Sequence, residues 1–169
     1  RDEVVEDVLL PELGAGDVPV LAVLAAAAQV GDGEDAAHLD PREARDAEGR
    51  TPLMAAISHG ANEGIVSLFI DAGADVNASG FDNRSTPLTL AASVGAAPEV
   101  IGMLLAAGAD IRARLADGTT ALSLAAQKSR NVMTIERLLK CGAEVDSVDD
   151  VGATPLMHAL VFRQPPAAV

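Results

Sequence analysis

The chain has 169 residues, of which 49% are hydrophobic but only 2% aromatic, with no Trp and no Tyr. Alanine and small aliphatic side chains must fill its interior, which favours thin, closely packed helices over the core and pockets of a globular enzyme. Its formal net charge of −13 disfavours nucleic acid and anionic membranes as partners and favours a basic protein surface. The alternative is that this charge only keeps the protein soluble.

The N-terminal segment predicts an irregular start. Residues 4–9 predict a short degenerate helix that Pro11 ends, and Asp17 predicts the cap of a second helix that runs to about residue 28. Together they predict a degenerate capping repeat over residues 1–30.

An acidic connector is predicted over residues 31–45. Its carboxylates (Asp32, Glu34, Asp35 and Asp40) invite comparison with a calcium-binding loop. Such a loop needs glycine at its sixth position, however, and counting from Asp32 the fifth and sixth residues are both Ala. A solvated loop without metal is therefore expected.

Two unrelated hexapeptides then recur with one period. Variants of Thr51-Pro-Leu-Met-Ala-Ala begin at Thr86, Thr120 and Thr154, at spacings of 35, 34 and 34 residues. Ala72-Gly-Ala-Asp-Val-Asn returns at Ala107 and Cys141 with the same step. Such a period indicates a stack of short repeats in which each unit packs on its neighbours.

Each unit predicts two short helices. In the first unit, Thr51 is a good N-cap and Pro52 suits the first helical turn. Leu53, Ala56 and Ile57 form the apolar stripe of the first helix, which ends at Gly60, and a more apolar second helix follows until Gly73. The residues expected to form that second stripe are Ile65, Val66, Leu68, Phe69 and Ile70.

These motifs resemble those of ankyrin repeat proteins, a resemblance that covers residues 46 to 162. It implies an all-α solenoid of helix–turn–helix repeats, in which β-hairpin fingers project between repeats and the first helices line a concave face. We expect ankyrin repeats at 46–80, 81–114 and 115–148 and an incomplete C-terminal repeat at 149–169. The parent array is expected to continue beyond Val169, or the tail to act as an imperfect cap, so that Val145, Leu156 and Leu160 are partly uncovered.

One finger departs from the pattern. Arg84 stands where the other fingers have Gly49, Gly118 and Gly152, a position that favours a positive φ. We expect Asn83 or Gly80 to take over that conformation.

The resemblance implies that a partner contacts the fingertips and the exposed positions of the first helices. Carried over position by position, the predicted surface comprises Glu48, Arg50, Ser58 and His59, then Asp82, Asn83, Ser93 and Val94, then Asp117, Thr119, Gln127 and Lys128, and finally Asp150, Val161 and Phe162.

Four further residues strengthen the case for the fingers. Phe81 lies in a finger, where no core needs it, and Arg84, Arg112 and Arg114 cluster in or beside two fingers. Aromatic and arginine side chains are frequent anchors of interfaces, so we expect a partner to enclose Phe81 and to present carboxylates to the arginines. The alternative is that Phe81 folds back over its own hairpin.

Nothing in the sequence predicts catalysis, a cofactor, a metal site or a small-molecule substrate. Gly14-Ala-Gly16 lacks the third glycine of a dinucleotide fingerprint, and His38, His59 and His158 share no helical spacing. Cys141 is the only cysteine, which excludes an internal disulfide, and we expect it to be a partly buried structural thiol.

The sequence therefore predicts a non-catalytic module, a scaffold or adaptor, that binds a protein. No segment predicts membrane insertion or a signal peptide, and a cytoplasmic location is expected, although a targeting segment ahead of Arg1 stays open. Two alternatives remain: the ankyrin arm of a larger enzyme, channel or effector, and a permanent architectural subunit of a large complex.

Overall fold

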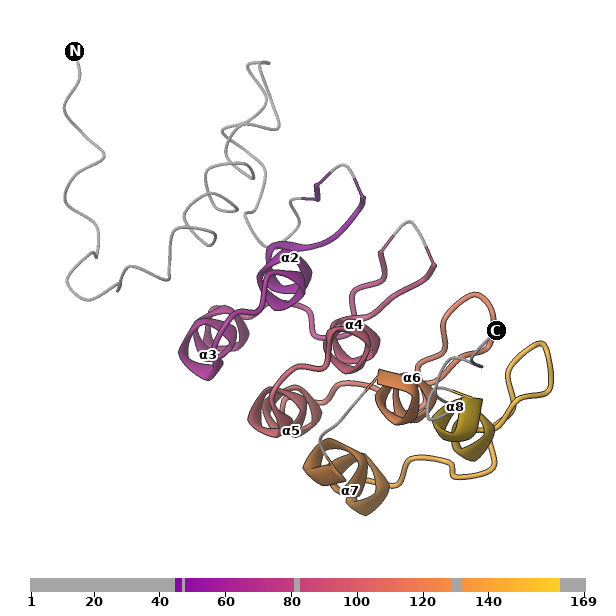
Figure 1. The fold of residues 1–169 in the computed structure, drawn as a ribbon. Helices are drawn as coiled ribbons and strands as arrows, with labels where there is room; N and C mark the ends of the chain where they lie inside the picture. The colour runs from indigo at the N-terminus through magenta and orange to yellow at the C-terminus, as the bar shows by residue number, and fades with distance from the viewer. Residues whose placement is uncertain (1–44, 47, 81–82, 129–131, 162–169) are drawn as a thin grey trace, which may run out of the picture.

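The computed structural model describes residues 45–46, 48–80, 83–128 and 132–161. These residues form α-helices in two rows (Figure 1), which confirms the predicted all-α repeat fold. The inner row consists of α2 (Pro52–Ser58), α4 (Pro87–Val94), α6 (Ala121–Lys128) and α8 (Pro155–Val161), and the outer row of α3 (Glu63–Asp71), α5 (Pro98–Ala106) and α7 (Val132–Lys140). Each inner helix packs on the next inner helix, and α3, α5 and α7 pack on one another in the same order. The expected capping repeat and acidic connector lie outside the described residues, except for Arg45.

Threonine caps start the inner helices. Thr51 Oγ1 accepts a hydrogen bond from the backbone N–H of Met54 at 3.3 Å, and Thr120 Oγ1 does the same for Ser123. Thr86 and Thr89 cap α4 reciprocally, since each side chain accepts a bond from the other residue's backbone N–H. The repeated threonine therefore satisfies N–H groups that lack partners within the helix.

The helices end as the glycines predict. At the end of α5, the N–H of Gly108 donates to the carbonyl of Leu105, and the N–H of Ala109 donates to that of Leu104. Gly108 has a φ of 91°, a left-handed conformation that is unfavourable for residues with a Cβ.

The core lies between the two rows. Leu53 and Ile57 of α2 are buried, as the predicted stripe requires, and Val66 of α3 is fully enclosed. The second stripe is only partly internal, because Leu68 is 64% exposed on α3. The same interior continues through Leu88, Ile101, Leu104, Leu122 and Leu138.

The fingers are tight turns rather than regular β-hairpins. Among the described residues, the only β-type pairing is an isolated antiparallel bridge between Arg114 and Thr120. In place of strands, single backbone bonds such as that from Leu115 to Thr119 close the fingers, and side chains add further bonds.

Candidate partner-binding surface

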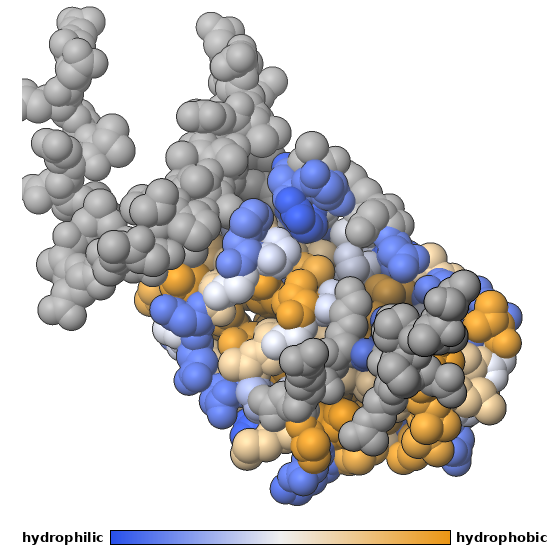
Figure 2. Space-filling view, in the orientation of Figure 1, coloured by the Kyte–Doolittle hydropathy of each residue, from blue (hydrophilic) through white to orange (hydrophobic). Residues whose placement is uncertain are grey.

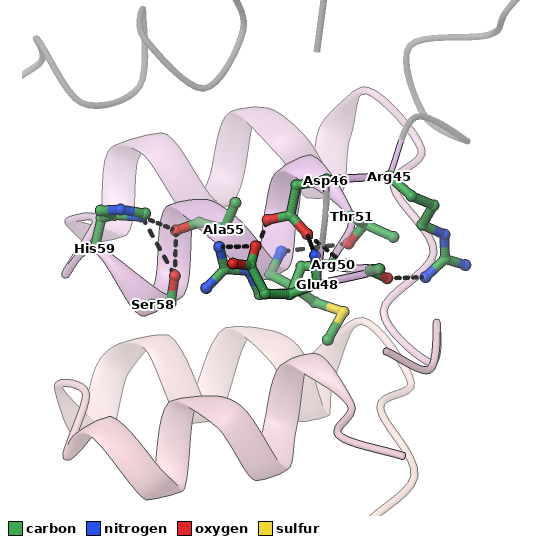
Figure 3. Close-up of polar contacts among 10 residues, drawn as sticks. Arg45, Asp46, Glu48, Arg50, Thr51, Ala55, Ser58 and His59 are labelled. Atoms are coloured by element: carbon green, nitrogen blue, oxygen red, sulfur yellow. Dashed lines mark hydrogen bonds and ion pairs between the residues drawn. The ribbon is translucent and has the colours of Figure 1, made fainter. Parts of the chain in front are cut away.

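The first finger is built around Asp46. Its carboxylate accepts bonds from the backbone N–H groups of Glu48 and Arg50, at 3.1 and 2.8 Å, and from Arg50 Nε at 2.7 Å (Figure 3). Burial acts to raise the pKa of Asp46, but the hydrogen bonds from Arg50 outweigh it and hold this pKa below the ordinary value of 3.8. Arg50 also contacts Glu48 Oε2 at 3.0 Å, so its charge is used within the finger.

The last finger repeats this arrangement with Asp149. Its Oδ1 accepts bonds from the N–H groups of Val151 and Ala153, and its Oδ2 lies 2.8 Å from Nε2 of His158 on α8. The hydrogen bond from Ala153 is the main reason that the pKa of Asp149 lies below 3.8, against the smaller opposing effect of burial. The contact between His158 and Asp149 therefore joins the last finger to α8, the helix that follows it.

The third finger has Leu115 at the position of these two aspartates. Leu115 packs against the hydrophobic core, and its backbone N–H donates to the carbonyl of Thr119 at 2.9 Å. Asp117, two residues later, instead accepts a bond from the N–H of Thr119 at 3.0 Å. This exchange places a carboxylate at the exposed tip of the finger.

Arg84 itself adopts the conformation that glycine has in the other fingers. Its φ is 54°, and it is the only described residue other than glycine with a positive φ. The expectation that Asn83 or Gly80, instead of Arg84, would adopt the positive φ was therefore wrong. The side chain of Arg84 is exposed.

Two arginines, Arg45 and Arg114, each bond both their own finger and the next one along the chain. Arg45 Nη1 donates to the carbonyls of Gly49 in its own finger and Ser79 in the next, at 3.0 and 2.9 Å. Arg114 Nη1 does the same for Gly118 and Val148, at 3.2 and 3.0 Å. Because both arginines occupy the same place in the repeat, the same contact recurs at two positions of the array.

Backbone bonds join the fingertips as well. The N–H of Ala116 donates to the carbonyl of Asn83 at 3.0 Å, and the N–H of Asp150 donates to that of Asp117 at 3.0 Å. At the base of the fingers, Asn77 accepts a bond from the N–H of Asp110 and donates one to the carbonyl of Gly108. The fingers thus form one connected, hydrogen-bonded edge.

Glu144 pairs with the arginines that were expected to face a partner. Arg114 Nη2 lies 3.2 Å from Glu144 Oε2, and Arg112 Nε lies 4.0 Å from Glu144 Oε1. The arginine cluster is therefore partly neutralised by this chain. Asp117 and Asp150 are exposed at the fingertips and form no ion pair within 4 Å with another described residue.

The inner helices contribute the second part of the predicted surface. Ser58 and His59 lie together at the end of α2, where both contact the carbonyl of Ala55, at 2.8 and 2.7 Å (Figure 3). Ser93 and Val94 end α4, and Val94 is 45% exposed. Gln127 is half-buried in α6, Lys128 is the last residue of that helix, and Val161 is 69% exposed on α8.

Three members of the predicted surface, Phe81, Asp82 and Phe162, lie outside the described residues. Thr119 needs a correction: it is only 8% exposed, so its side chain offers little surface to a partner. Its N–H donates to Asp117 and its carbonyl accepts from Leu115, so it is part of the closed turn. Cys141 was also misjudged, since it is exposed rather than partly buried.

Sequence reasoning missed the residues that make the fingers rigid. Arg45, Asn77 and Glu144 were not singled out. Arg45 and Arg114 nevertheless share one repeat position, and Glu144 stands one period after Asp110, at the same position of the repeat. Aligning the repeats by polar as well as apolar residues would have found them.

Within the described residues, no three His, Cys, Asp or Glu side chains are grouped so as to hold a metal ion. None of the described helices is long and apolar enough to cross a membrane. A groove of about 520 Å³ lies between α5 and α7 on the outer face, away from the fingers, with Leu105, Ile111 and Arg137 in its lining.

Two stacked rows of short helices joined by projecting fingers define a helical-repeat solenoid. The family model described as ankyrin repeats (3 copies) matches residues 24–114 and 96–168, and the chain belongs to the ankyrin repeat family. Proteins of this kind are generally protein–protein interaction modules and typically non-catalytic. No curated protein sequence matches the chain.

Proposed function

We propose that the chain binds a basic protein partner along its fingertips and the exposed ends of its inner helices, as a scaffold or adaptor. The observation that supports this proposal best is the connected edge of fingers, in which Arg45, Arg114 and the backbone bonds between fingertips tie neighbouring units together. A pre-ordered edge of this kind loses little conformational entropy when a partner binds.

Charge supports the choice of partner. Arg50 is paired with Asp46 and Glu48, and Arg112 and Arg114 share Glu144, whereas Asp117 and Asp150 project without an ionic partner among the described residues. Among the described residues of the fingers, the exposed carboxylates without an ionic partner, Asp117 and Asp150, outnumber the one such guanidinium, Arg84, which suits lysines and arginines on a partner. Phe81 and Arg84 remain predicted contacts of the second finger.

The test begins with affinity capture of a partner on the full chain, followed by cross-linking and mass spectrometry. The chain has two lysines, Lys128 in an inner helix and Lys140 in an outer one, so a zero-length carbodiimide reagent, which joins an amine only to a carboxylate in direct contact with it, reports which row the partner contacts. Cross-links from Lys128 but not from Lys140 are expected. Cross-links confined to Lys140 would place the partner on the outer row and contradict the proposal.

A charge-matched pair of variants then tests the fingertips. Asp117→Asn/Asp150→Asn keeps the oxygen of residue 117 that accepts a bond from the N–H of Thr119 but removes two carboxylates, and should slow association and reduce its salt dependence. Asp71→Asn/Glu136→Gln removes the same charge from exposed positions on the outer helices and should leave association nearly unchanged. Equal effects of the two variants, measured by surface plasmon resonance, would show that only net charge matters.

A further inference from the structure

The groove between α5 and α7 combines apolar and basic side chains. It has a volume of about 520 Å³ and lies on the outer row, at the edge of the array opposite the fingers (Figure 1). Leu105, Ala106 and Ile111 form much of its apolar wall, which comes from α5 and the turn that follows it. Along this edge, hydrophobic residues lie beside hydrophilic ones (Figure 2).

Two cations of α7 line the opposite wall. Arg137 and Lys140 lie one helical turn apart, and both face the groove. They are the only basic side chains of the described outer helices, in a chain whose formal net charge is −13. The groove is therefore a local basic site on an acidic protein.

The repeat fold does not require these cations. The positions of Arg137 and Lys140 hold Met103 and Ala106 in α5, and α3 contains no basic residue at all. Cations in the last turn of a helix also interact favourably with the helix dipole, but that effect needs no groove. Because α3 and α5 form and pack without them, the two cations are free to serve recognition.

Arg137 lies directly against the backbone of α5. A Cβ on Gly102 would collide with its guanidinium, so the missing side chain of Gly102 makes room for it. Arg137 forms no ion pair within 4 Å and no side-chain hydrogen bond with another described residue. Lys140 lies 3.9 Å from Glu136, and this pair is weak because both side chains are mostly exposed. The groove thus presents unused guanidinium donors beside an apolar wall.

We propose that this groove binds an extended, acidic segment of a second protein. A carboxylate of the segment pairs with Arg137, whose planar guanidinium suits a two-bond contact with a carboxylate. An apolar side chain of the segment packs between Leu105 and Ile111. The groove follows α7 from Met133 to Cys141, a rise of about 12 Å, which accommodates about four residues of extended chain.

Charge and polarity favour such a segment over a nucleic acid. The net charge of the chain opposes a long polyanion, whereas a short segment with one or two carboxylates meets mainly the nearby cations. The apolar wall also has no counterpart in a phosphate backbone. The inference does not depend on the proposed binding at the fingertips, which lie on the opposite edge and would select a basic partner.

The test is selection of random peptides, displayed on phage, against the full chain. The enriched peptides should include a class that combines Asp or Glu with a large apolar residue. Synthetic peptides of this class should slow alkylation of Cys141 by a maleimide, because Cys141 is exposed and lines the groove. Since Cys141 is the only cysteine, the reaction reports this site alone. Failure to enrich acidic, apolar peptides, or peptides that leave Cys141 equally reactive, would overturn the proposal.

Charge variants locate the binding site of the selected peptide. Arg137→Glu/Lys140→Glu should weaken its affinity by roughly tenfold or more, because two attractive charges become repulsive. Arg84→Glu/Arg112→Glu is the matched control, since it makes the same change of charge at exposed positions of the fingers and should leave the affinity nearly unchanged. Fluorescence anisotropy of a labelled peptide measures both. Equal losses in the two variants would show that the peptide responds only to net charge.

A third variant tests the groove without changing its charge. Ala106 is exposed in the lining, so Ala106→Phe should fill the groove, weaken peptide binding and leave the fold intact. Circular dichroism checks that each variant is folded, and Arg137→Gln/Lys140→Gln is the milder replacement if the charge reversal is not. Full affinity in either folded groove variant contradicts the proposal.

Discussion

Two buried threonines provide a paired test of the packing described above. Thr134, in α7, is 2% exposed and its Oγ1 has no hydrogen-bond partner among the described residues. The same repeat position is apolar and buried in the other units, where it is Ile65 and Val100. Thr89, in α4, is 1% exposed, but its hydroxyl accepts a bond from the N–H of Thr86 at 2.8 Å and donates one to the Thr86 carbonyl at 3.1 Å.

The same substitution should therefore have opposite effects at these two sites. A buried hydroxyl without a partner costs about 1–3 kcal/mol, so Thr134→Val should raise the free energy of unfolding by about 1–2 kcal/mol. Valine has nearly the shape of threonine and the same branching at Cβ, which limits repacking. Thr89→Val leaves the N–H of Thr86 without its acceptor and breaks the reciprocal cap, and should lower the free energy of unfolding by about 1–2 kcal/mol.

Urea denaturation followed by far-ultraviolet circular dichroism measures both changes, because the chain has no Trp or Tyr for fluorescence. In a thermal scan, each change of about 1 kcal/mol corresponds to roughly 2–4 °C. If Thr134→Val destabilises the array as much as Thr89→Val, the hydroxyl of Thr134 has a partner and the reasoning fails.

Two further predictions concern the repeats. Gly108→Val should lower the free energy of unfolding by roughly 1–3 kcal/mol. The cause would be backbone strain alone, since the φ of Gly108 is 91° and an added Cβ would meet no atom within 4 Å. An unchanged melting curve would refute the assigned helix end. Amide hydrogen exchange should be fastest in α8 and slowest between Leu88 and Leu124, because α8 packs mainly on α6 and its apolar residues are exposed. Strong protection of 155–161 would show that something else covers this helix.

The repeat architecture could be predicted from the sequence because it depends on local signals that recur. Thr51 and Pro52 mark a helix start, and Gly60 and Gly73 mark helix ends, whatever surrounds them. Once the period was found, the burial of Leu53 predicted that of Leu88 and Leu122. The incomplete last repeat, without a second helix, predicted the exposure of Val145, Leu156 and Leu160, which the structure confirms.

The surface was harder to predict because it depends on contacts between repeats. Arg112 and Arg114 were conspicuous in an acidic chain, but Glu144, which pairs with both, lies about one period further on. Thr119 lies two residues after the exposed Asp117 and is nevertheless buried, and its carbonyl is bonded to Leu115 four residues earlier. Local motifs do not contain this information.

The last prediction concerns the stability of the protein in acid, and it rests on the carboxylates of Asp149 and Asp46, which accept hydrogen bonds within the fingers. Asp149 has a lowered pKa, so its contribution to stability is complete above the ordinary Asp value of 3.8 and is lost as the pH falls through the lowered pKa. Asp149→Asn keeps an acceptor for the N–H groups of Val151 and Ala153 but loses the charge that meets His158. The variant should therefore be less stable than the wild type near neutral pH, and the difference should shrink between about pH 5 and about pH 2, where the wild-type carboxylate takes up a proton. Asp46, whose pKa is lowered by Arg50, should behave in the same direction in Asp46→Asn. Thermal melting followed by circular dichroism at several pH values measures the difference. A gap that stays constant, or that widens as the pH falls, would show that these carboxylates do not stabilise the fingers through their charge.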